Sequence, residues 1–320
     1  MKYLIVCDYR EKFPNPKAND HYSFNSILNI KNTINELGFQ CEYFGGVNEL
    51  IKAISTQKYD KEATYLNFND GLHGEFKRGQ TPFLLDMMNV VYSGSNPLTH
   101  LIISNKLFTN KFLDNKIKNL FIPKTISIKS TKEIENITLN FPVIVKPNNE
   151  GSSIGITNDS ICNNLDEVKK IYDSIKRLGE IIVQEFINGY ELTNFFMVDK
   201  KSNFVFNELL LISKDDDLNM NNKVFTSNDK FEHKRKYNDP HIILSDNIIN
   251  EIKKITTAIA KELNIKTFGR IDYKLYNQKL HFIEANTNPA FSITSDIGEI
   301  CKIYNKTFKE MIHLFLNSIN

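Results

Sequence analysis

A single predicted hairpin limits the architectures open to this chain. Its sequence is GRIDYKLYNQKLHFIEAN (269–286), in which two alternating runs flank a turn near Asn277–Gln278 and predict two antiparallel strands. Counting outward from that turn places Asp272 close to opposite Glu284. Like charges directly across a strand pair are destabilising, so this pairing requires a compensating cation. The hairpin is therefore a candidate site for a divalent metal ion.

The atoms offered to such an ion are all oxygens. Period-two alternation puts Asn286 on the same face as Glu284, which adds an amide oxygen to the two carboxylates. Mg²⁺ is typically held by one or two carboxylates together with substrate phosphates. We therefore predict that Asp272, Glu284 and Asn286 bind Mg²⁺ (or Mn²⁺). The alternative is an exposed hairpin whose acids are neutralised by Arg270 and Lys274, which share the face of Asp272.

A second stretch places a lysine beside a loop of small residues. Its sequence is FPVIVKPNNEGSSIGI (141–156), an apolar strand that runs through Lys146 into a loop rich in glycine and serine. Gly151 and Gly155 let main-chain N–H groups approach a ligand closely, and the lysine adds a positive charge. This combination suits a polyphosphate. The alternative is an ordinary hairpin turn.

A third stretch follows the predicted metal-binding strand directly. It reads NTNPAFSITSD (286–296), where Pro289 stiffens the loop and small hydroxylated residues leave hydrogen-bond donors pointing inward. Such a loop is fit to hold a carboxylate or a developing oxyanion. Because it adjoins Glu284 and Asn286, we expect it to belong to the same site.

Composition excludes several classes of protein. The 320 residues are 41% hydrophobic and 24% charged, which provides ample material for more than one buried core. Lys and Arg number 40 against 38 Asp and Glu, so the net charge of +2 gives no reason to expect a nucleic acid or a membrane as partner. We find no long apolar stretch and expect a cytoplasmic protein. The four cysteines are scattered without CxxC spacing, which favours reduced, buried thiols over zinc or disulfides.

The order of predicted elements indicates an α/β unit followed by an α+β unit. The first unit is a small open layer with a parallel sheet, made of strands at 3–7, 39–44 and 63–68 and helices at 23–37 and 81–89. After about Thr99 the pattern changes. We expect there a helix at 163–177, three successive antiparallel strands in IIVQEF, YELTNFFMV and NFVFNELLLI, a mobile loop or lid at 213–240, a helix at 246–262, the hairpin at 267–286 and a last helix at 297–317.

These stretches, in this order, resemble the ATP-grasp superfamily and within it the D-alanine:D-alanine ligase-like carboxylate–amine ligases. The resemblance covers roughly Asn67 to Ser295. The matching pieces are GLHG (71–74), YSGSNPLT (92–99), SNK (104–106), the lysine and glycine-rich stretch, VQEFINGYE (183–191), GRID (269–272) and EANTNPA (284–290). The implied fold has an N-terminal Rossmann-like, pre-ATP-grasp α/β domain (1–97), a small central lid subdomain with the glycine-rich loop (98–181), and a C-terminal antiparallel-sheet subdomain with the magnesium site (182–320).

The resemblance also implies roles for individual residues. Lys106 and Lys146 would bind the ATP phosphates, and Ser152 and Ser153 would lie in the loop that closes over them. Gln184 and Glu185 would contact the adenine, and Glu191 would hold the ribose. The implied catalytic residues are Arg270, which steadies the phosphorylated intermediate, Ser152 and, in the lid, Lys230. The implied substrate-binding residues are Ser295, which reaches the carboxylate of the second amino acid, Ala290 and His73.

The chain departs from this family where the first substrate binds. The family has a GG-x-S-x-E element after the first strand, and the corresponding segment CDYREKFPNPKAND (7–20) does not match it. GGVNEL (45–50) follows the second strand and is interpreted as a turn before a helix. Lys230-Phe231 stands where the family has a Lys-Tyr pair, and Tyr237 could compensate for the lost tyrosine hydroxyl. Ala290 stands where the family has a glycine, and we expect it to narrow the substrate pocket.

The implied function is ATP-dependent amide-bond formation through an acyl phosphate. One alternative is an amino-acid ligase of specialised metabolism that acts on another amino acid or on a substrate presented by a carrier protein. A second alternative, from another class, is a non-catalytic nucleotide-binding regulatory protein. The expected partners are small amino-acid or carboxylate substrates, and the family suggests a homodimer.

Overall fold

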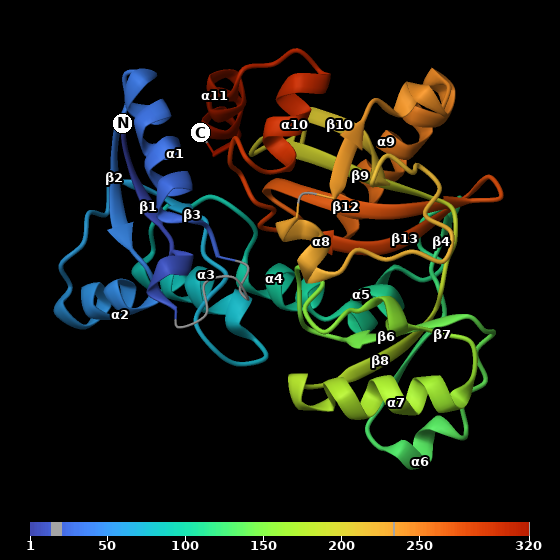
Figure 1. Cartoon of the computed structure of the whole chain (residues 1–320). Coiled ribbons are helices and arrows are strands. Elements are labelled where there is room, and N and C mark those ends of the chain that lie inside the picture. Colours follow the sequence, from blue (N-terminus) through green and yellow to red (C-terminus); the bar gives the residue numbers. More distant parts are fainter. Residues whose placement is uncertain (14–20, 233, 320) are drawn as a thin grey trace.

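The strands of this protein form three sheets that lie apart in the molecule (Figure 1). The computed structural model describes residues 1–13, 21–232 and 234–319, without the side chains of residues 230 and 231. The sheets have three, six and four strands, in the orders β2-β1-β3, β11-β10-β9-β12-β13-β4 and β5-β8-β6-β7. The predicted class, an α/β unit followed by mixed α and β layers, is confirmed.

The N-terminal unit surrounds the three-stranded sheet. Its elements are β1 (Lys2–Val6), η1 (Arg10–Lys12), α1 (Phe24–Glu36), β2 (Gln40–Gly45), α2 (Val47–Thr56), β3 (Thr64–Asn67) and α3 (Lys77–Met88). β1 pairs in parallel with both β2 and β3, so its apolar run is buried in the middle of the sheet. α1 begins where the Ser23 side chain accepts a hydrogen bond from the backbone N–H of Ser26, and the chain turns at Gly38 with φ of 87°. The predicted parallel layer is confirmed.

The four-stranded sheet is built from the middle of the chain. Its elements and their neighbours are α4 (Pro97–Ser104), α5 (Lys106–Leu113), β5 (Thr125–Ile128), α6 (Thr131–Ile134), β6 (Val143–Pro147), η3 (Asn158–Ser160), β7 (Ile161–Cys162), α7 (Leu165–Ile175), η4 (Lys176–Leu178) and β8 (Ile181–Glu185). α7 covers one face of this sheet, where Val168 and Ile171 pack against Val143 and Val145 (Figure 1). The strand that carries Lys146 is therefore backed by its own apolar core.

One predicted pairing is wrong. The sequence suggested that β8 would run in one antiparallel sheet with the next two strands, but β8 pairs with β5 and β6 in the four-stranded sheet. The chain crosses to the six-stranded sheet through Gly189, whose φ is 99° and where a Cβ would lie 2.3 Å from the carbonyl oxygen of Leu275. Alternation in the sequence predicts strands but does not say which neighbours they take.

The six-stranded sheet contains the predicted hairpin. Its strands and the helices inserted between them are β4 (Leu120–Phe121), β9 (Tyr190–Val198), β10 (Phe204–Lys214), α8 (Ser227–Phe231), β11 (Arg235–Asn238), η5 (Pro240–Ile242), α9 (Asp246–Glu262), β12 (Thr267–Tyr276) and β13 (Lys279–Asn286). The turn between β12 and β13 is formed by Asn277 and Gln278, with φ of 47° and 61°, as predicted. α9 buries Ile252 and Ile259 against this sheet. The predicted lid at 213–240 contains α8 and β11, and β11 pairs with β10.

The last predicted helix is two helices, which corrects the sequence analysis. They are α10 (Asp296–Ile303) and α11 (Phe308–Ile319). The break follows Tyr304, whose hydroxyl donates to the backbone carbonyl of Leu209, and Asn305 adopts φ of 50°. Two separate helices allow α11 to pack against both α1 and β12. Continuous apolar periodicity across the break concealed it in the sequence.

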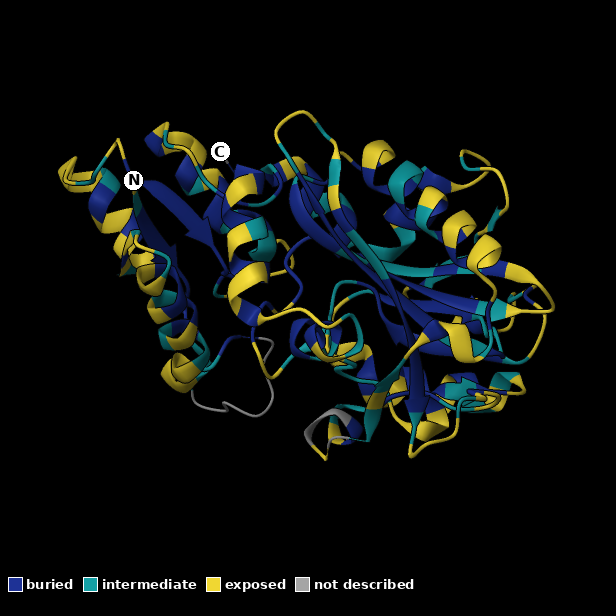
Figure 2. Cartoon of the chain, turned by 90° about the horizontal axis from the view of Figure 1, so that it is seen from above, coloured by how far each residue is buried: buried dark blue, intermediate teal, exposed yellow. Residues whose placement is uncertain are grey.

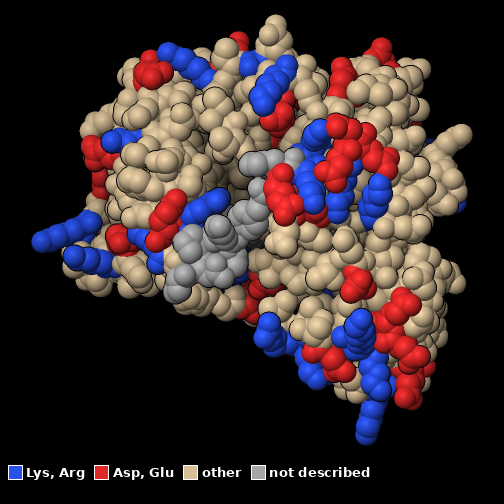
Figure 3. Space-filling model, in the orientation of Figure 1, with Lys and Arg blue, Asp and Glu red and all other residues tan. Residues whose placement is uncertain are grey.

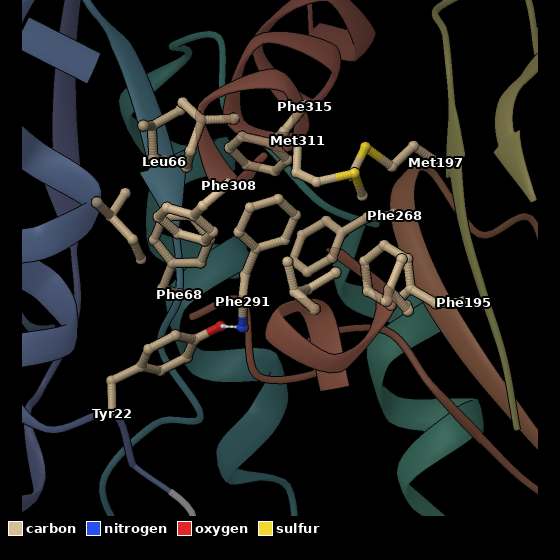
Figure 4. Close-up of a cluster of buried hydrophobic side chains, with 14 of the residues drawn as sticks. Tyr22, Leu66, Phe68, Phe195, Met197, Phe268, Phe291, Phe308, Met311 and Phe315 are labelled. Carbon is tan, nitrogen blue, oxygen red and sulfur yellow. Dashed lines mark hydrogen bonds between the residues drawn. The ribbon is translucent and has the colours of Figure 1, made fainter. Parts of the chain in front are cut away.

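A shared aromatic core joins the N-terminal unit to the six-stranded sheet. The rings of Phe68, Phe268, Phe291 and Phe315 contact one another at centroid separations of 5.0–6.3 Å (Figure 4). The Tyr22 hydroxyl accepts a hydrogen bond from the backbone N–H of Phe291 at 2.7 Å. The NTNPA loop is thereby held by residues from both ends of the chain.

The surface agrees with the compositional argument. Strands are buried and the helices turn an exposed face outward (Figure 2), and acidic and basic side chains are interspersed over the face drawn in Figure 3. None of the helices within the described ranges combines the length and apolar character needed to cross a bilayer. All four cysteines are buried free thiols, as expected.

Candidate active site

A large pocket opens between the four-stranded sheet and the six-stranded sheet. It holds about 990 Å³ of space, including space open to solvent. Nine of the predicted site residues line it: Lys106, Lys146, Ser153, Gln184, Glu185, Glu191, Arg270, Asp272 and Glu284. An adjoining pocket of about 700 Å³ adds Ser152, Asn286 and Ala290 and shares Lys106, Arg270 and Glu284 with the first. The fold therefore brings together residues that are far apart in the sequence.

The two acidic residues of the hairpin face each other as predicted. Asp272 is the cross-strand partner of Glu284 because the β12–β13 register shifts by one residue between Asp272 and Tyr273; without that shift Asp272 would lie opposite Ile283. Asp272 is buried and accepts hydrogen bonds from Arg270 Nε at 2.9 Å and Nη2 at 2.8 Å, and from the Thr193 hydroxyl. Burial raises the pKa of Asp272, Arg270 opposes that shift and the Glu284 carboxylate reinforces it. The pair thus gains from an additional cation.

The oxygen atoms at this hairpin fit a hard divalent cation. Glu284 is partly exposed, with Lys106 Nζ at 3.7 Å and Arg270 Nη2 at 3.8 Å. Asn286 Oδ1 accepts one hydrogen bond, from the backbone N–H of Asn288 at 2.9 Å, and a carbonyl oxygen has a second lone pair. No group of three or more His, Cys, Asp and Glu side chains suited to a metal occurs among the described residues. An ion here would need the Asn286 oxygen and ligand phosphates besides the two carboxylates.

The alternative for the hairpin, an exposed surface whose acids are neutralised by Arg270 and Lys274, agrees with the structure only in part. Arg270 does contact Asp272, but Lys274 lies beside Glu191 at 3.4 Å rather than beside either acid of the hairpin. Arg270 also donates to Asp296 at 2.7 Å. The face of the hairpin is a pocket wall and not exposed surface. Neutralisation by the two cations therefore does not account for this arrangement.

The two predicted phosphate-binding lysines occupy different parts of the pocket. Lys146 is buried on β6, and its Nζ donates to Gln184 Oε1 at 2.9 Å. Lys106 begins α5, and its Nζ donates to the backbone carbonyl of Glu150 at 2.5 Å. Burial, together with the charge of Lys106, lowers the pKa of Lys146 to about 8, and Glu284 opposes the shift.

This lowered pKa predicts that nucleotide binding weakens in alkaline solution. An anionic phosphate binds the protonated lysine, so above about pH 8 the free protein must take up a proton at Lys146 to bind. We expect the dissociation constant for ATP to rise by up to about tenfold per pH unit above that value. Calorimetric titration from pH 7 to 9.5 measures it. Lys146→Arg should flatten the profile because guanidinium stays charged, and an equal slope in both proteins would contradict the assignment.

The glycine-rich loop lines the pockets and contacts neighbours on two sides. Ser227, at the start of α8, places its hydroxyl 3.3 Å from the backbone carbonyl of Ser152 and 3.0 Å from that of Ser153. Gly155 adopts φ of 77°, and a Cβ there would lie 2.7 Å from Leu178 Cδ1. The carboxylate of Glu150 pairs with Lys77 at 3.2 Å. The predicted lid thus contacts the glycine-rich loop, while the side chain of Lys230 lies outside the described residues.

Sequence reasoning missed Arg235, which also lines the large pocket. Its guanidinium lies over the ring of Phe225 at 5.8 Å and that of Tyr237 at 5.3 Å. The Tyr237 hydroxyl donates to Asp296 and does not line either pocket, so it is engaged away from the position suggested for the first substrate. The alternation of RKYN in β11 places Arg235 and Tyr237 on one face and was the available signal.

The smaller pocket gains residues from the N-terminal unit that the sequence analysis did not select. These are Asp70 and Arg78, which lie after β3 and in α3. Asp70 is buried, and its Oδ1 is 3.4 Å from Nδ2 of Asn288 in the NTNPA loop. Ligands commonly bind beyond the carboxyl ends of parallel strands, and the position of NDG after β3 was a signal for this.

Two predicted substrate residues do not line the pockets. His73 is exposed, and its backbone carbonyl accepts a hydrogen bond from Gln80 Nε2 at 2.8 Å. The Ser295 hydroxyl lies 2.6 Å from the backbone carbonyl of Ala290 and 2.7 Å from that of Ser292, within its own loop. The segment 7–20, which lacks the family glutamate, lies partly outside the described residues. GGVNEL leads into α2, as interpreted from the sequence.

Comparisons with known proteins agree with this geometry. The family model described as "D-ala D-ala ligase C-terminus" matches residues 119–317. A D-alanine–D-alanine ligase from Pelagibacter ubique (strain HTCC1062) is 30% identical over 264 residues, which cover 78% of this chain and 80% of that protein. One from Thermotoga petrophila is 28% identical over 299 residues, 92% of each chain.

Solved structures share the fold across the whole chain. The crystal structure of D-alanine–D-alanine ligase from Bacillus anthracis complexed with ATP has a TM-score of 0.73 at 16% identity and covers 100% of this chain and 97% of its own. The VanG D-Ala:D-Ser ligase from Enterococcus faecalis has a TM-score of 0.75 at 17% identity, with coverage of 100% and 99%. Since the family model spans more than half of the residues, the chain belongs to the D-alanine–D-alanine ligase family and has the ATP-grasp fold.

Proposed function

We propose that this protein is an ATP-dependent ligase that joins the carboxylate of one amino acid to the amine of another, with D-alanine as the first candidate for both. One observation carries the proposal. Two facing carboxylates, two lysines and a glycine-rich loop surround one pocket, and a smaller pocket opens from it beside Arg270 and Glu284. The first pocket suits a nucleoside triphosphate, and the second suits an amino acid.

The nucleotide roles follow from the contacts of the large pocket. Lys106 and Lys146 would hold phosphate oxygens, and the backbone of Ser152 and Ser153 would close over them. Gln184 and Glu185 would meet the base, at the end of β8. The hairpin oxygens of Asp272, Glu284 and Asn286 would hold Mg²⁺ (or Mn²⁺), which offsets the charge of the phosphoryl group when bound.

The residues of this chain would then act on a carboxylate placed in the smaller pocket. That carboxylate would attack the γ-phosphorus of ATP and release ADP, and the amine of the second amino acid would then displace inorganic phosphate from the acyl phosphate and lose a proton to form the amide. Arg270 stands where both pockets meet and would stabilise the negative charge on the reacting oxygens. The contact of Ser227 with the glycine-rich loop would exclude water from the acyl phosphate.

Asp70 and Arg78 supply charges that the first-substrate site otherwise lacks. A buried carboxylate suits an ammonium group, and a guanidinium suits a carboxylate. Together they match the two charged ends of an amino acid. They would take the place of the family glutamate that is absent from the sequence.

Amino-acid-stimulated ADP release tests the function. We expect stimulation by D-alanine, with ADP and dipeptide formed in equal amounts, in a coupled assay that screens D- and L-amino acids singly and in pairs. Asp70→Asn should raise the half-saturating amino-acid concentration roughly 10- to 100-fold and leave that of ATP unchanged, because one charge-assisted hydrogen bond is lost. Thermal unfolding of the variant controls for folding. Tight ATP binding without stimulation by any amino acid would contradict the proposal and favour a regulatory protein.

A further inference from the structure

A buried lysine in the large pocket has no role in the chemistry described above. Lys274 on β12 is 6% exposed and lines the pocket. Its Nζ lies 3.4 Å from Glu191 Oε2, but within the described residues it has no hydrogen-bond partner. A buried ammonium without hydrogen bonds is costly, and buried polar groups in native proteins are nearly always satisfied. Lys274 is thus placed to donate to a ligand in the pocket.

The position of Lys274 indicates which part of a nucleotide it meets. Lys274 is the cross-strand partner of Glu191 in the β12–β9 register, so the two side chains form one patch of the pocket wall. Asp272 lies two residues earlier on β12, which is roughly 7 Å at the rise of a strand. A nucleotide whose terminal phosphates lie at Asp272 therefore reaches this patch with its sugar.

A sugar hydroxyl satisfies both members of this patch at once. A carboxylate only accepts hydrogen bonds and an ammonium only donates them, whereas a hydroxyl does both. A hydroxyl that donates to Glu191 can accept from Lys274, and each bond is strengthened by a charged partner. A sugar carbon without that hydroxyl leaves the buried Lys274 Nζ unsatisfied.

We propose that Lys274 donates a hydrogen bond to the ribose hydroxyl that the family resemblance assigns to Glu191, and that Lys274 thereby makes this protein select ribonucleotides over deoxyribonucleotides. The inference rests on the proposed ATP-dependent function and adds Lys274 as a specificity-determining residue. Lys274 contributes the donor, and Glu191 contributes the acceptor. Rejection of a deoxynucleotide follows from the buried ammonium that it would leave without a hydrogen bond.

Binding of three nucleotides to the full chain tests this without requiring turnover. Calorimetry in the presence of Mg²⁺ gives dissociation constants for ATP, 2′-deoxy-ATP and 3′-deoxy-ATP on the wild type and on Lys274→Met. We expect the wild type to bind at least one deoxy analogue roughly 10- to 100-fold more weakly than ATP, which corresponds to one charge-assisted hydrogen bond. Lys274→Met should reduce that ratio to within about threefold, because the group that rejects the analogue is gone.

Two further variants complete the design. Lys279→Met is the matched control, since this exposed lysine on β13 lines neither pocket and should keep the wild-type ratio. Lys274→Leu, which likewise has no donor, replaces Lys274→Met if thermal unfolding shows that the methionine variant does not fold. Equal binding of ATP and both analogues by the wild type, or an unchanged ratio in the Lys274 variant, would overturn the inference alone. A wild type that binds none of the three nucleotides would sink the proposed function and this inference with it.

Discussion

Glu284→Gln is expected to lower ligase turnover strongly and to leave the fold intact. The substitution keeps the size of the side chain but deletes one of the two charges that face each other across β12 and β13. A Mg²⁺ ion at this position then has one carboxylate instead of two, and the phosphoryl group loses compensation of its charge. We expect kcat to fall on the order of 10²–10³-fold, as for loss of one electrostatic contact in a transition state. ADP release at saturating ATP and amino acid measures it.

The stability of the Glu284 variant separates a lost metal ligand from a damaged fold. Glu284 is partly exposed and lies 3.7 Å from Lys106 Nζ and 3.8 Å from Arg270 Nη2, so these two ion pairs contribute little to the free energy of unfolding. The melting temperature should therefore stay close to that of the wild type. Glu262→Gln, at an exposed position at the end of α9, serves as the matched control with normal turnover. Normal turnover in Glu284→Gln would refute the metal assignment.

Arg270→Met is expected to cost both activity and stability. Arg270 is the shared partner of two buried carboxylates, with contacts of 2.8 Å to Asp272 and 2.7 Å to Asp296. Burial alone would raise the pKa of Asp296, but the charges of Arg270 and Arg235 hold it at about 2. Removing Arg270 leaves two negative charges without their main partner, which costs about 3–5 kcal/mol of unfolding free energy. Urea denaturation measures this loss.

A second substitution tests whether the loss arises from those charges. Arg270→Met with Asp296→Asn removes one of the orphaned carboxylates, so the double variant should recover part of the unfolding free energy lost by the single variant. Its ligase activity should not recover, because Arg270 stands where the two pockets meet. Equal stabilities of the single and double variants would show that Asp296 does not depend on Arg270. Recovered turnover would remove Arg270 from the chemistry.

The sequence by itself predicted the parts of the site that local patterns encode. The turn at Asn277–Gln278 and the closeness of Asp272 to Glu284 followed from the sequence, but equal counting on either side of the turn sets Asp272 opposite Ile283. A register shift between Asp272 and Tyr273 makes Glu284 the partner of Asp272, so the exact pairing was decided by the folded hairpin. The strand that carries Lys146 and the loop after it were evident because apolar residues and glycines mark both in one stretch. Each of these features depends on neighbours within about twenty residues.

Pairings between distant segments were decided by the tertiary structure alone. β8 (Ile181–Glu185) joined the four-stranded sheet, and α11 separated from α10 to reach both α1 and β12. Periodicity shows which face of an element is apolar, but not which partner covers that face.

The same reason explains which site residues the sequence could not supply. Three pocket residues lie in polar segments whose sequences resemble solvated surface: Arg235, Asp70 and Arg78. Arg235 lines the large pocket because β11 pairs with β10, and the other two line the smaller pocket because the N-terminal unit packs beside it. The alternative interpretation of the hairpin paired Lys274 with the hairpin's acids, whereas Lys274 pairs with Glu191 on β9. Charge and residue type are written in the sequence, but the burial and the partner that give a charge its function come from contacts across the fold.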